Sequence, residues 1–460
     1  MYQINFKKPI HIHFIGIGGI SMSGLAEILL NEGFTVSGSD RQESPLTKHL
    51  SEKGAFISCP QSAANLSSNV DAVVFTAAIG SSNPEYAAAR AANIPMLTRA
   101  ELLGQIMDNY AHSFAVAGTH GKTTTTSMLS QILLSAKTDP TISVGGMLSA
   151  IGGNIRVGGS GVFLTEACEY TNSFLHFYPK YSLILNIEED HMDFFRDLAH
   201  IRDSFRKFAQ NTLSGGAIII NQEIENYQEI TDGLPVSVIA YGLLDTCDYY
   251  PQDISFGSDG CASYTLMHRG KAVMPVSLSV PGMHNVSNSL AAAAAALTFQ
   301  ISPEAVSDGL SLYRGTDRRF QFKGVFGDNV TVIDDYAHHP TEIAATLAAA
   351  QNYPHKRIVC VFQPHTYSRT KAFLKEFAAA LSSADIVVLA DVYAARETDT
   401  LGISSKDLQN ALEKLGTNVW YFPSFPEIEK FLQKKCINGD LLITMGAGDI
   451  VNIGENLLCQ

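Results

Sequence analysis

Short apolar runs alternate with helix-patterned segments over most of the chain, and polar or glycine residues follow many of these runs. In the first part, such runs predict strands at 10–15, 34–38 and 72–76, and a helix that ends at Leu30 separates the first two. In the last part they predict strands at 330–333, 357–362, 386–390 and 441–444, with helical patterns at 340–351 and 371–382. Because strand and helix alternate in this way in doubly wound sheets, we expect an α/β protein with a Rossmann-like domain at each end.

The middle of the chain adds a different pattern. A strand at 114–117 leads through a glycine-rich turn into a helix that opens at Thr123, and further strands are expected at 161–164 and 181–185. Between 227 and 280 the strands are shorter and alternate more, which predicts a β-layer added to a central P-loop ATPase-like α/β domain. A run of six alanines at 291–296 predicts a closely packed helix. We therefore expect three domains, at 1–109, 110–316 and 317–460.

The turn after the strand at 114–117 reads Gly118-Thr-His-Gly-Lys-Thr-Thr124. Strand, Gly-Lys-Thr and helix follow one another in the order of a phosphate-binding loop. Amide groups at the start of a helix hold phosphate oxygens, Lys122 can neutralise the outer phosphates, and the Thr123 hydroxyl can bind Mg²⁺. The general pattern has its first glycine where Val116 stands, and Gly118 arrives two residues late. The candidate ATP-binding residues of the loop are Gly118, Thr119, His120, Gly121, Lys122, Thr123 and Thr124.

Two polar residues follow strands of the same expected sheet. Glu166 comes after the strand at 161–164, and His191 lies beyond the strand at 181–185. Because carboxyl ends of parallel strands meet at one edge, Thr123, Glu166 and His191 are the candidate Mg²⁺ ligands. A hard cation prefers oxygen, so the carboxylate is an expected ligand and the histidine an unusual one. Lys122, Glu166 and His191 are also candidate catalytic residues, and an ordinary polar strand end is the alternative for Glu166 or His191 taken alone.

A second glycine-rich turn follows the first strand, and the second strand ends in Ser39-Asp40. In Rossmann-like folds the glycines let the backbone approach a pyrophosphate, and the acidic residue lies near a ribose. A dinucleotide fingerprint has glycine where Ser21 stands, so NAD or FAD is the less favoured ligand. The candidate nucleotide-binding residues here are Gly16, Gly18, Gly19, Ser21, Ser39 and Asp40.

Two further pairs of residues are site candidates, and the arginine pair lies at the expected junction of the second and third domains. Arg318 and Arg319 could bind phosphate, couple ATP binding to domain closure and so take part in catalysis; a solvated surface pair is the alternative. Asn285 and Asn288, just before the alanine run, could hydrogen-bond adenine. The alternative for Asn288 is an N-cap of that helix.

Strand ends in the last domain carry His338, His339, His365 and Arg369. The histidines lack zinc-site spacing and no cysteine joins them, so substrate anchoring is favoured over metal binding. Arg369 could hold a carboxylate bidentately, and His338 and His365 could contact the second substrate. A solvated sheet edge is the alternative.

Composition narrows the class of protein. The 460 residues carry a formal net charge of −13, which disfavours a general nucleic-acid or anionic-membrane binder. Seven scattered cysteines with no Cys-x-x-Cys are typical of reduced thiols, and no Gly-x-Ser-x-Gly elbow is present. The apolar run at 10–30 contains two histidines, four glycines and Glu27, so it is unlike a signal peptide. We expect a soluble cytoplasmic monomer or homodimer without membrane insertion.

Together these motifs resemble the Mur ligase family, ATP-dependent enzymes that form amide bonds. The resemblance covers essentially the whole chain and rests on the loop at 118–124 and on the segments 13–28, 315–320, 334–342, 362–370 and 446–449. It implies a UDP-sugar domain, an ATP domain and a C-terminal domain that recruits the amino acid. It also implies UDP-N-acetylmuramate and L-alanine as substrates, ATP and Mg²⁺, and an acyl phosphate intermediate in peptidoglycan biosynthesis.

The chain departs from the family pattern at two places. Ser21 stands where glycine is usual, and Glu166-Ala-Cys-Glu169 replaces the commoner Glu-Ala-Asp form, so a second acidic contact moves to Glu169 or is lost. The rival activities are murein-peptide ligation to the same UDP-sugar, folate polyglutamylation, and nucleotide sensing without turnover. The glycine-rich opening at 16–19 favours biosynthesis over peptide recycling.

Overall fold

A computed structural model describes residues 2–76, 79–395, 397–398 and 401–459. The chain forms two compact units, each of them discontinuous in sequence. The first holds 1–188, 198–241 and 291–305, and the second holds 189–197, 242–290 and 306–460. None of the described helices is long and apolar enough to cross a membrane.

The N-terminal sheet of the first unit is parallel, with the order β3-β2-β1-β4-β5. Its strands are β1 (His11–Ile15), β2 (Thr35–Ser39), β3 (Phe56–Ser58), β4 (Ala72–Phe75) and β5 (Met96–Thr98). The helices that connect and follow them are α1 (Ile20–Asn31), α2 (Pro45–Glu52), α3 (Pro84–Ala91) and α4 (Arg99–Met107), with a short turn η1 (Ala63–Asn65). The order reverses direction at β1, which puts the glycine turn after β1 at a ligand-binding position of this fold.

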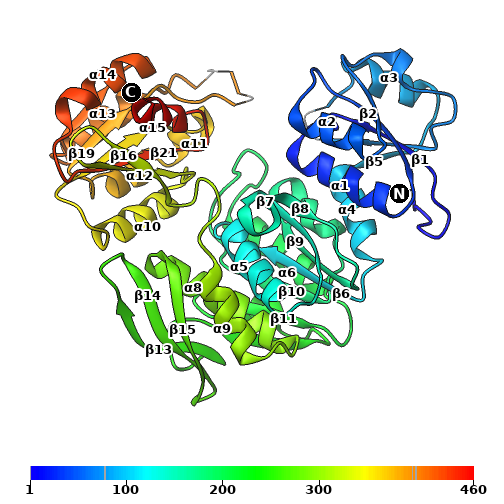
Figure 1. The fold of residues 1–460 in the computed structure, drawn as a ribbon, viewed down its shortest axis with the longest axis horizontal. Coiled ribbons are helices and arrows are strands. Elements are labelled where there is room, and N and C mark those ends of the chain that lie inside the picture. Colours follow the sequence, from blue (N-terminus) through cyan, green and yellow to red (C-terminus); the bar gives the residue numbers. More distant parts are fainter. Residues whose placement is uncertain (1, 77–78, 396, 399–400, 460) are drawn as a thin grey trace. The chain divides into compact units, whose positions relative to one another are not determined.

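The central sheet of the first unit has the order β12-β11-β10-β6-β9-β7-β8. β6 (His112–Ala117) lies between β10 (Tyr181–Ile184) and β9 (Val162–Ala167), as Figure 1 shows. The outer strands are β7 (Thr141–Leu148), the antiparallel β8 (Gly153–Arg156), β11 (Ala217–Asn221) and β12 (Ser237–Tyr241). The helices are α5 (Lys122–Ser135), α6 (Leu198–Gln210), α7 (Gln228–Thr231), η2 (Ser149–Ile151) and η3 (Tyr170–His176). Residues 114–117 of β6 are fully buried, which explains their unbroken apolar run.

The expected β-layer belongs to the second unit. It consists of the antiparallel strands β13 (Tyr249–Phe256), β14 (Cys261–His268) and β15 (Lys271–Pro281). Helices α8 (Met283–Thr298) and α9 (Pro303–Leu312) follow in the chain. The alanines at 291–296 are fully buried inside α8, as a closely packed helix requires. Because α8 begins at Met283, Asn288 lies inside the helix and the N-cap interpretation is wrong.

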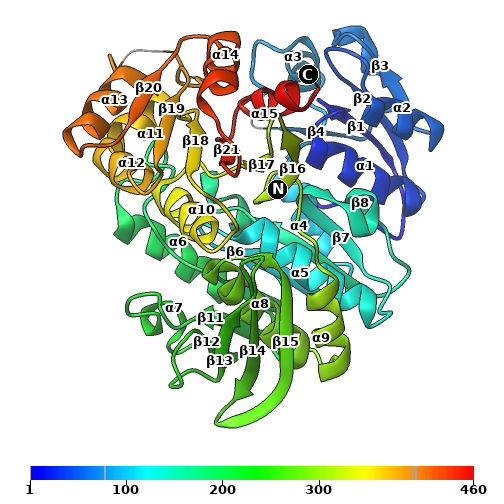
Figure 2. The same ribbon diagram turned by 60° about the vertical axis from the view of Figure 1, so that its left-hand side comes forward.

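The last sheet has the order β16-β17-β21-β18-β19-β20. The strands are β16 (Gln321–Phe326), β17 (Val330–Asp335), β18 (Ile358–Phe362), β19 (Ile386–Leu389), β20 (Val419–Tyr421) and β21 (Leu441–Met445). All pairs are parallel except β16, which pairs antiparallel to β17 and was not anticipated. One face packs on α10 (Pro340–Gln351), α12 (Leu374–Leu381) and α13 (Ser405–Lys414), and the other on α14 (Phe425–Lys435) and α15 (Val451–Leu458), as Figure 2 shows.

The helix expected at 371–382 is confirmed over most of its length, but the expectation places its start too early. The helical pattern at 371–382 forms two helices, α11 (Tyr367–Ala372) and α12, which meet at Phe373. Phe373 has φ −114° and ψ 27°, outside the α-helical region, so the axis breaks there. With that exception, the three-layer α/β class is confirmed for both Rossmann-like sheets and for the central domain with its added β-layer.

A close backbone approach in the first unit gives a test of this packing. A Cβ on Gly104 of α4 would lie 2.1 Å from the backbone oxygen of His176. Gly104→Ala should therefore destabilise the protein by about 1–3 kcal/mol through overpacking, despite a gain of about 1 kcal/mol in helix propensity. Urea denaturation measures the change. Gly80→Ala is the control because nothing lies within 4 Å of its added Cβ, and equal midpoints for the two variants would contradict the packing.

Candidate active site

The loop between β6 and α5 has the backbone conformation of a phosphate-binding turn. Gly118 has φ +150° and Gly121 has φ +80°, values that favour glycine, and a Cβ on Gly118 would lie 2.9 Å from Leu185. The His120 amide donates to Asn186 Oδ1 (2.7 Å), and Asn186 Nδ2 donates back to the His120 carbonyl (3.1 Å). The loop is therefore held in place by the end of β10 before any ligand arrives.

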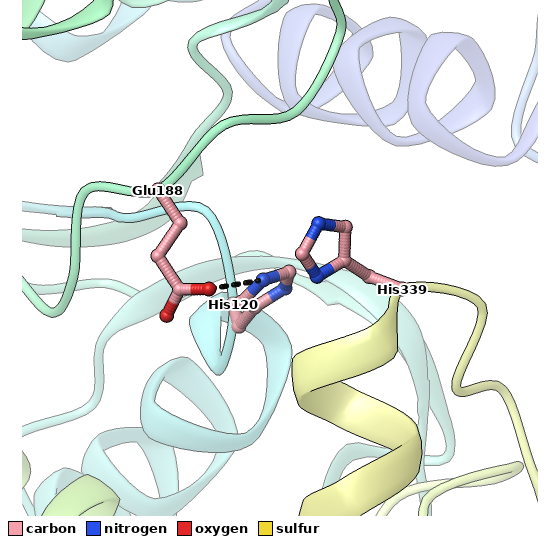
Figure 3. Close-up of side chains that lie close together, drawn as sticks. All are labelled: His120, Glu188 and His339. Atoms are coloured by element: carbon pink, nitrogen blue, oxygen red, sulfur yellow. Dashed lines mark ion pairs between the residues drawn. The ribbon is translucent and has the colours of Figure 1, made fainter. Parts of the chain in front are cut away.

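Figure 3 shows a second contact of the loop, in which His120 Nε2 lies 3.6 Å from a carboxylate oxygen of Glu188. The Glu188 amide N–H also donates a hydrogen bond to Thr119 Oγ1 (3.0 Å). Both contacts tie the loop to the segment after β10. Thr119 and His120 therefore lie on the phosphate loop as expected, with side chains that stabilise the loop itself.

The Lys122 ammonium is buried and already paired. Its Nζ lies 2.9 Å from Glu169 Oε2 and donates to the carbonyl oxygens of Thr119 (3.1 Å) and Gly118. Burial acts to lower the pKa of Lys122, but the charge of Glu169 outweighs it and raises that pKa above its ordinary value. The second acidic contact of the family pattern is thus supplied by Glu169, one of the two outcomes expected from the sequence.

Thr123 and Glu166 meet at the end of β9. Thr123 Oγ1 donates to Glu166 Oε2 (3.1 Å), and Glu166 Oε1 accepts from the Gly145 amide (2.5 Å). A Cβ on Gly145 would lie 2.9 Å from both Glu166 oxygens, so the close approach needs glycine. A hydroxyl and a carboxylate side by side next to the phosphate loop form the oxygen donor set that Mg²⁺ prefers. These residues fit the expected metal.

The third expected ligand, His191, belongs to the second unit, within 189–197. Its amide donates to Asp190 Oδ1 (2.7 Å), and Arg369 of α11 binds the same oxygen through NH2 (2.8 Å) and Nε (3.1 Å). Burial raises the pKa of Asp190, but the charge of Arg369 outweighs this and lowers it well below its usual range. The sequence pattern missed Asp190, and only its position between Glu189 and His191 could have drawn attention to it.

Arg369 is therefore a paired side chain and not an open fork. Its NH1 also lies 3.1 Å from His365 Nδ1 and donates to the His365 carbonyl (3.0 Å). A substrate carboxylate would have to share the guanidinium with Asp190. The amino-acid-binding role of Arg369 stays a prediction.

Two histidines at this sheet edge, His338 and His365, are uncharged at neutral pH because burial lowers their pKa. His338 Nδ1–H donates to the Tyr336 carbonyl (3.0 Å), and burial lowers the pKa of His338 to about 4. Burial likewise lowers the pKa of His365 to about 4. His339 caps α10 by accepting from the Thr341 amide (3.4 Å). Two neutral imidazoles, at 338 and 365, stack edge to face with ring centroids 5.6 Å apart.

The arginine pair contacts the second unit's own backbone and acids. Arg318 donates to Asp334 Oδ2 (3.0 Å) and to the carbonyls of Gly448 (3.0 Å) and Gly446 (2.7 Å). Arg319 lies 3.8 Å from Glu342. The planar fork of Arg318 is filled by these acceptors, so its phosphate-binding role stays a prediction.

The expected adenine contacts lie within α8. Asn285 Nδ2 donates to the Pro281 carbonyl (2.7 Å), and Asn288 Nδ2 donates to Asn285 Oδ1 (3.2 Å). Both side chains are buried, so the amide groups stabilise the start of α8. Adenine recognition by these residues stays a prediction.

The glycine turn after β1 is held by β2. The amides of Gly16 and Ile17 donate to the Ser39 carbonyl (2.8 and 3.0 Å), and the Gly18 amide donates to Asp40 Oδ2 (2.8 Å). The Ser39 side chain is fully buried and donates its hydroxyl to Glu85. Asp40 therefore stabilises the turn through the Gly18 amide, and Ser39 stabilises it through its backbone carbonyl oxygen.

Glu85 was not found from the sequence. It is fully buried and accepts hydrogen bonds from the Ser62 amide (3.1 Å) and Asn65 Nδ2 (2.7 Å), besides Ser39. A glutamate in the first turn of a helix is an ordinary sequence feature, so no local signal separates it from an exposed one. Only the folded structure shows that the Glu85 carboxylate accepts a hydrogen bond from Ser39 at the end of β2.

The fold and site together are those of the Mur ligases. The family models that match are "Mur ligase family, catalytic domain" at 11–111, "Mur ligase middle domain" at 116–296 and "Mur ligase, glutamate ligase domain" at 318–448. The chain belongs to the Mur ligase family.

Individual relatives carry a more specific name. UDP-N-acetylmuramate–L-alanine ligases of Agathobacter rectalis and Lachnospira eligens are 65% and 57% identical to this chain, with 100% of each chain covered. The solved UDP-N-acetylmuramate–alanine ligase of Thermotoga maritima is 31% identical with a TM-score of 0.81, covering 98% of both chains. The murein peptide ligase of Psychrobacter arcticus is less similar, at 25% identity and a TM-score of 0.71 over the same coverage.

The neutral His338 predicts an acid-sensitive stability. Its pKa is about 4 in the folded chain against an ordinary 6.5, so between these values the unfolded chain binds a proton that the folded chain does not. The free energy of unfolding should therefore fall as pH drops from 6.5 toward 4. His338→Asn should make that fall less steep, as measured by urea midpoints across this pH range.

His355 provides the matched control for this titration. It is half-buried, and its Nδ1 donates to the Tyr353 carbonyl (2.7 Å), the same local contact as in His338. His355→Asn should leave the slope close to that of the unsubstituted protein. A His338→Asn slope equal to both would contradict the assignment.

Proposed function

We propose that this protein joins L-alanine to the lactyl carboxylate of UDP-N-acetylmuramate, with ATP converted to ADP and phosphate, in peptidoglycan biosynthesis. The observation that carries the proposal is the Thr123–Glu166 pair beside Lys122 on the phosphate loop of a Mur ligase chain. The identity of the curated relatives over the full chain supports these substrates. Murein-peptide ligation is the less favoured alternative.

We infer the domains 1–109 for the UDP-sugar, 110–316 for ATP and 317–460 for the amino acid. The matched family segments at 11–111, 116–296 and 318–448 support these bounds. ATP would be held by the loop at 118–124 with Asn285 and Asn288 at the adenine. The UDP-sugar would be held by Gly16, Gly18, Gly19, Ser21, Ser39 and Asp40, and the amino acid by His338, His365 and Arg369. We also propose a cytoplasmic location, where both nucleotide substrates are made.

The proposed mechanism makes the carboxylate reactive by phosphorylation. The chain offers no nucleophile elbow, and burial raises the pKa of the Cys168 thiol to about 11, so it is not a ready nucleophile. Transfer of the terminal phosphoryl group to the lactyl carboxylate gives an acyl phosphate, and attack by the neutral amine then releases phosphate. Lys122 and the amides at the start of α5 stabilise the charge that spreads over the phosphoryl oxygens.

Metal binding fits the same residues. Thr123 and Glu166, joined by His191 of the second unit, would hold Mg²⁺, which supplies a positive charge for the phosphoryl oxygens when bound. Arg318 and Arg319 would respond to the bound nucleotide and help to exclude water from the acyl phosphate. These roles are parts of the proposal.

Phosphate release tests the function. With ATP and UDP-N-acetylmuramate, release should depend on L-alanine among the twenty amino acids and exceed that with L-alanyl-γ-D-glutamyl-meso-diaminopimelate. Lys122→Ala should lower kcat by about 100-fold or more, because transferred charge is left uncompensated. Lys271→Ala, an exposed lysine of β15, is the control. Faster release with the peptide would favour the alternative activity, and a near-normal rate in folded Lys122→Ala would refute the ATP site.

An isotope experiment tests the route separately. UDP-N-acetylmuramate labelled with heavy oxygen in its lactyl carboxylate should pass one labelled oxygen to the released phosphate. The reason is that the carboxylate oxygen becomes the bridging oxygen of the acyl phosphate and leaves with phosphorus. Mass spectrometry of the phosphate measures the transfer. Unlabelled phosphate alongside fully labelled product would rule the acyl phosphate out.

A further inference from the structure

Arg99 is a half-buried arginine that the proposed mechanism does not use. It is the first residue of α4, directly after β5. Thr98 and Glu101 form a capping box in which the Glu101 amide donates to Thr98 Oγ1 (3.2 Å) and the Thr98 amide donates to Glu101 Oε2 (2.6 Å). The backbone position from which the Arg99 side chain extends is thus fixed by the start of the helix.

The guanidinium contacts the glycine turn of the expected UDP-sugar site. Arg99 NH1 donates to Ser21 Oγ (3.1 Å), near the N-terminus of α1. Among the described residues, the Arg99 guanidinium donates this one side-chain hydrogen bond, and it forms no ion pair with a carboxylate. A guanidinium carries five N–H donors in a planar fork, so most of them remain without a protein acceptor.

The same guanidinium also lies near the end of β9. Burial lowers the pKa of Arg99, and Cys168 and Glu166 act in the opposite direction. Arg99 therefore contacts Ser21 through NH1 and has the candidate Mg²⁺ ligand Glu166 in its electrostatic surroundings.

A half-buried charge that lacks a carboxylate partner is costly for the folded chain. A ligand anion that binds here would accept hydrogen bonds from the remaining N–H donors of the guanidinium and neutralise its charge. A planar carboxylate or a phosphoryl group accepts two parallel N–H bonds from arginine, which a lysine cannot supply. The contact with the glycine turn, with Glu166 in the electrostatic surroundings, matches the reacting end of a sugar acid whose nucleotide lies at that turn.

We propose that Arg99 binds the reacting carboxylate of the sugar-nucleotide substrate, with Ser21 holding the guanidinium in place. The inference rests on the proposed function and adds a residue to it. Before phosphoryl transfer, Arg99 orients the carboxylate, and after it the same fork binds the phosphorylated carboxyl group. Ser21, which stands where glycine is usual in the family, acquires in this chain the role of a positioning residue.

Binding of two sugar nucleotides separates this role from diphosphate binding. UDP-N-acetylmuramate carries the carboxylate, whereas UDP-N-acetylglucosamine carries the same diphosphate without it. Calorimetry on the full chain without ATP should show Arg99→Ala weakening the first ligand by about 10- to 100-fold and leaving the second unchanged. Arg99→Lys should be intermediate, because it keeps the charge and loses the fork, and Ser21→Ala should lose less than Arg99→Ala.

Arg90→Ala is the control, since Arg90 is an exposed residue in the last turn of α3. Equal weakening of both sugar nucleotides would mean that Arg99 binds the diphosphate, and no weakening would mean a structural role; either result overturns the inference. If Arg99→Ala does not fold, the same two affinities are compared for Arg99→Lys and Ser21→Ala. Weaker binding of UDP-N-acetylmuramate alone then supports the inference, and any other result overturns it. A wild-type chain that binds neither ligand would instead refute the proposed function, and the inference with it.

Discussion

The Lys122 ammonium has to remain charged at the end of β6, a strand whose residues are buried, and its contacts with Glu169 and two loop carbonyls make this possible. Without an acid nearby, burial would favour the neutral amine. Glu169 keeps the charge, and the carbonyls fix its position above the loop. Glu166 on β9 lies near the same cation, and Asn186 holds the loop that carries it through two hydrogen bonds with His120.

In the second unit burial lowers the pKa of His338 and of His365 to about 4, whereas Arg369 and Arg318 are paired with carboxylates and backbone oxygens. Arg369 contacts Asp190, and Arg318 contacts Asp334 together with the Gly446 and Gly448 carbonyls. These contacts satisfy guanidinium donors and fix side chains at the carboxyl edge of the sheet. Arg99 in the first unit differs because, within the described part of the chain, its fork donates to the Ser21 hydroxyl and pairs with no carboxylate, and this difference makes it a candidate for a ligand anion.

Glycine-rich turns follow both β6 and β1, but the backbone amides of the two turns donate to different kinds of acceptor. After β6 the His120 amide donates to the side-chain oxygen of Asn186, whereas after β1 the Gly18 amide donates to the Asp40 carboxylate. Asp40 therefore stabilises the turn through the Gly18 amide, at the position where the fold places an acidic residue near a ribose. Glu85, beneath Ser39, adds a buried acid that holds β2 and α3 together.

Patterns along the chain determined the strand–helix alternation, the three sheets, the phosphate loop and the residues Lys122, Thr123 and Glu166, because each depends on local spacing of apolar and polar positions. The tertiary structure alone decided what those residues contact. Their partners come from distant segments: Glu169 pairs with the charge of Lys122, Asp190 pairs with that of Arg369, and the Ser21 hydroxyl accepts from Arg99. The edge strand β16 and the break at Phe373 also escaped the sequence, since pairing and packing with distant elements set them. Local spacing fixes backbone direction, but burial and charge pairing depend on residues brought together by folding, and these decide which side chains are left to bind a ligand.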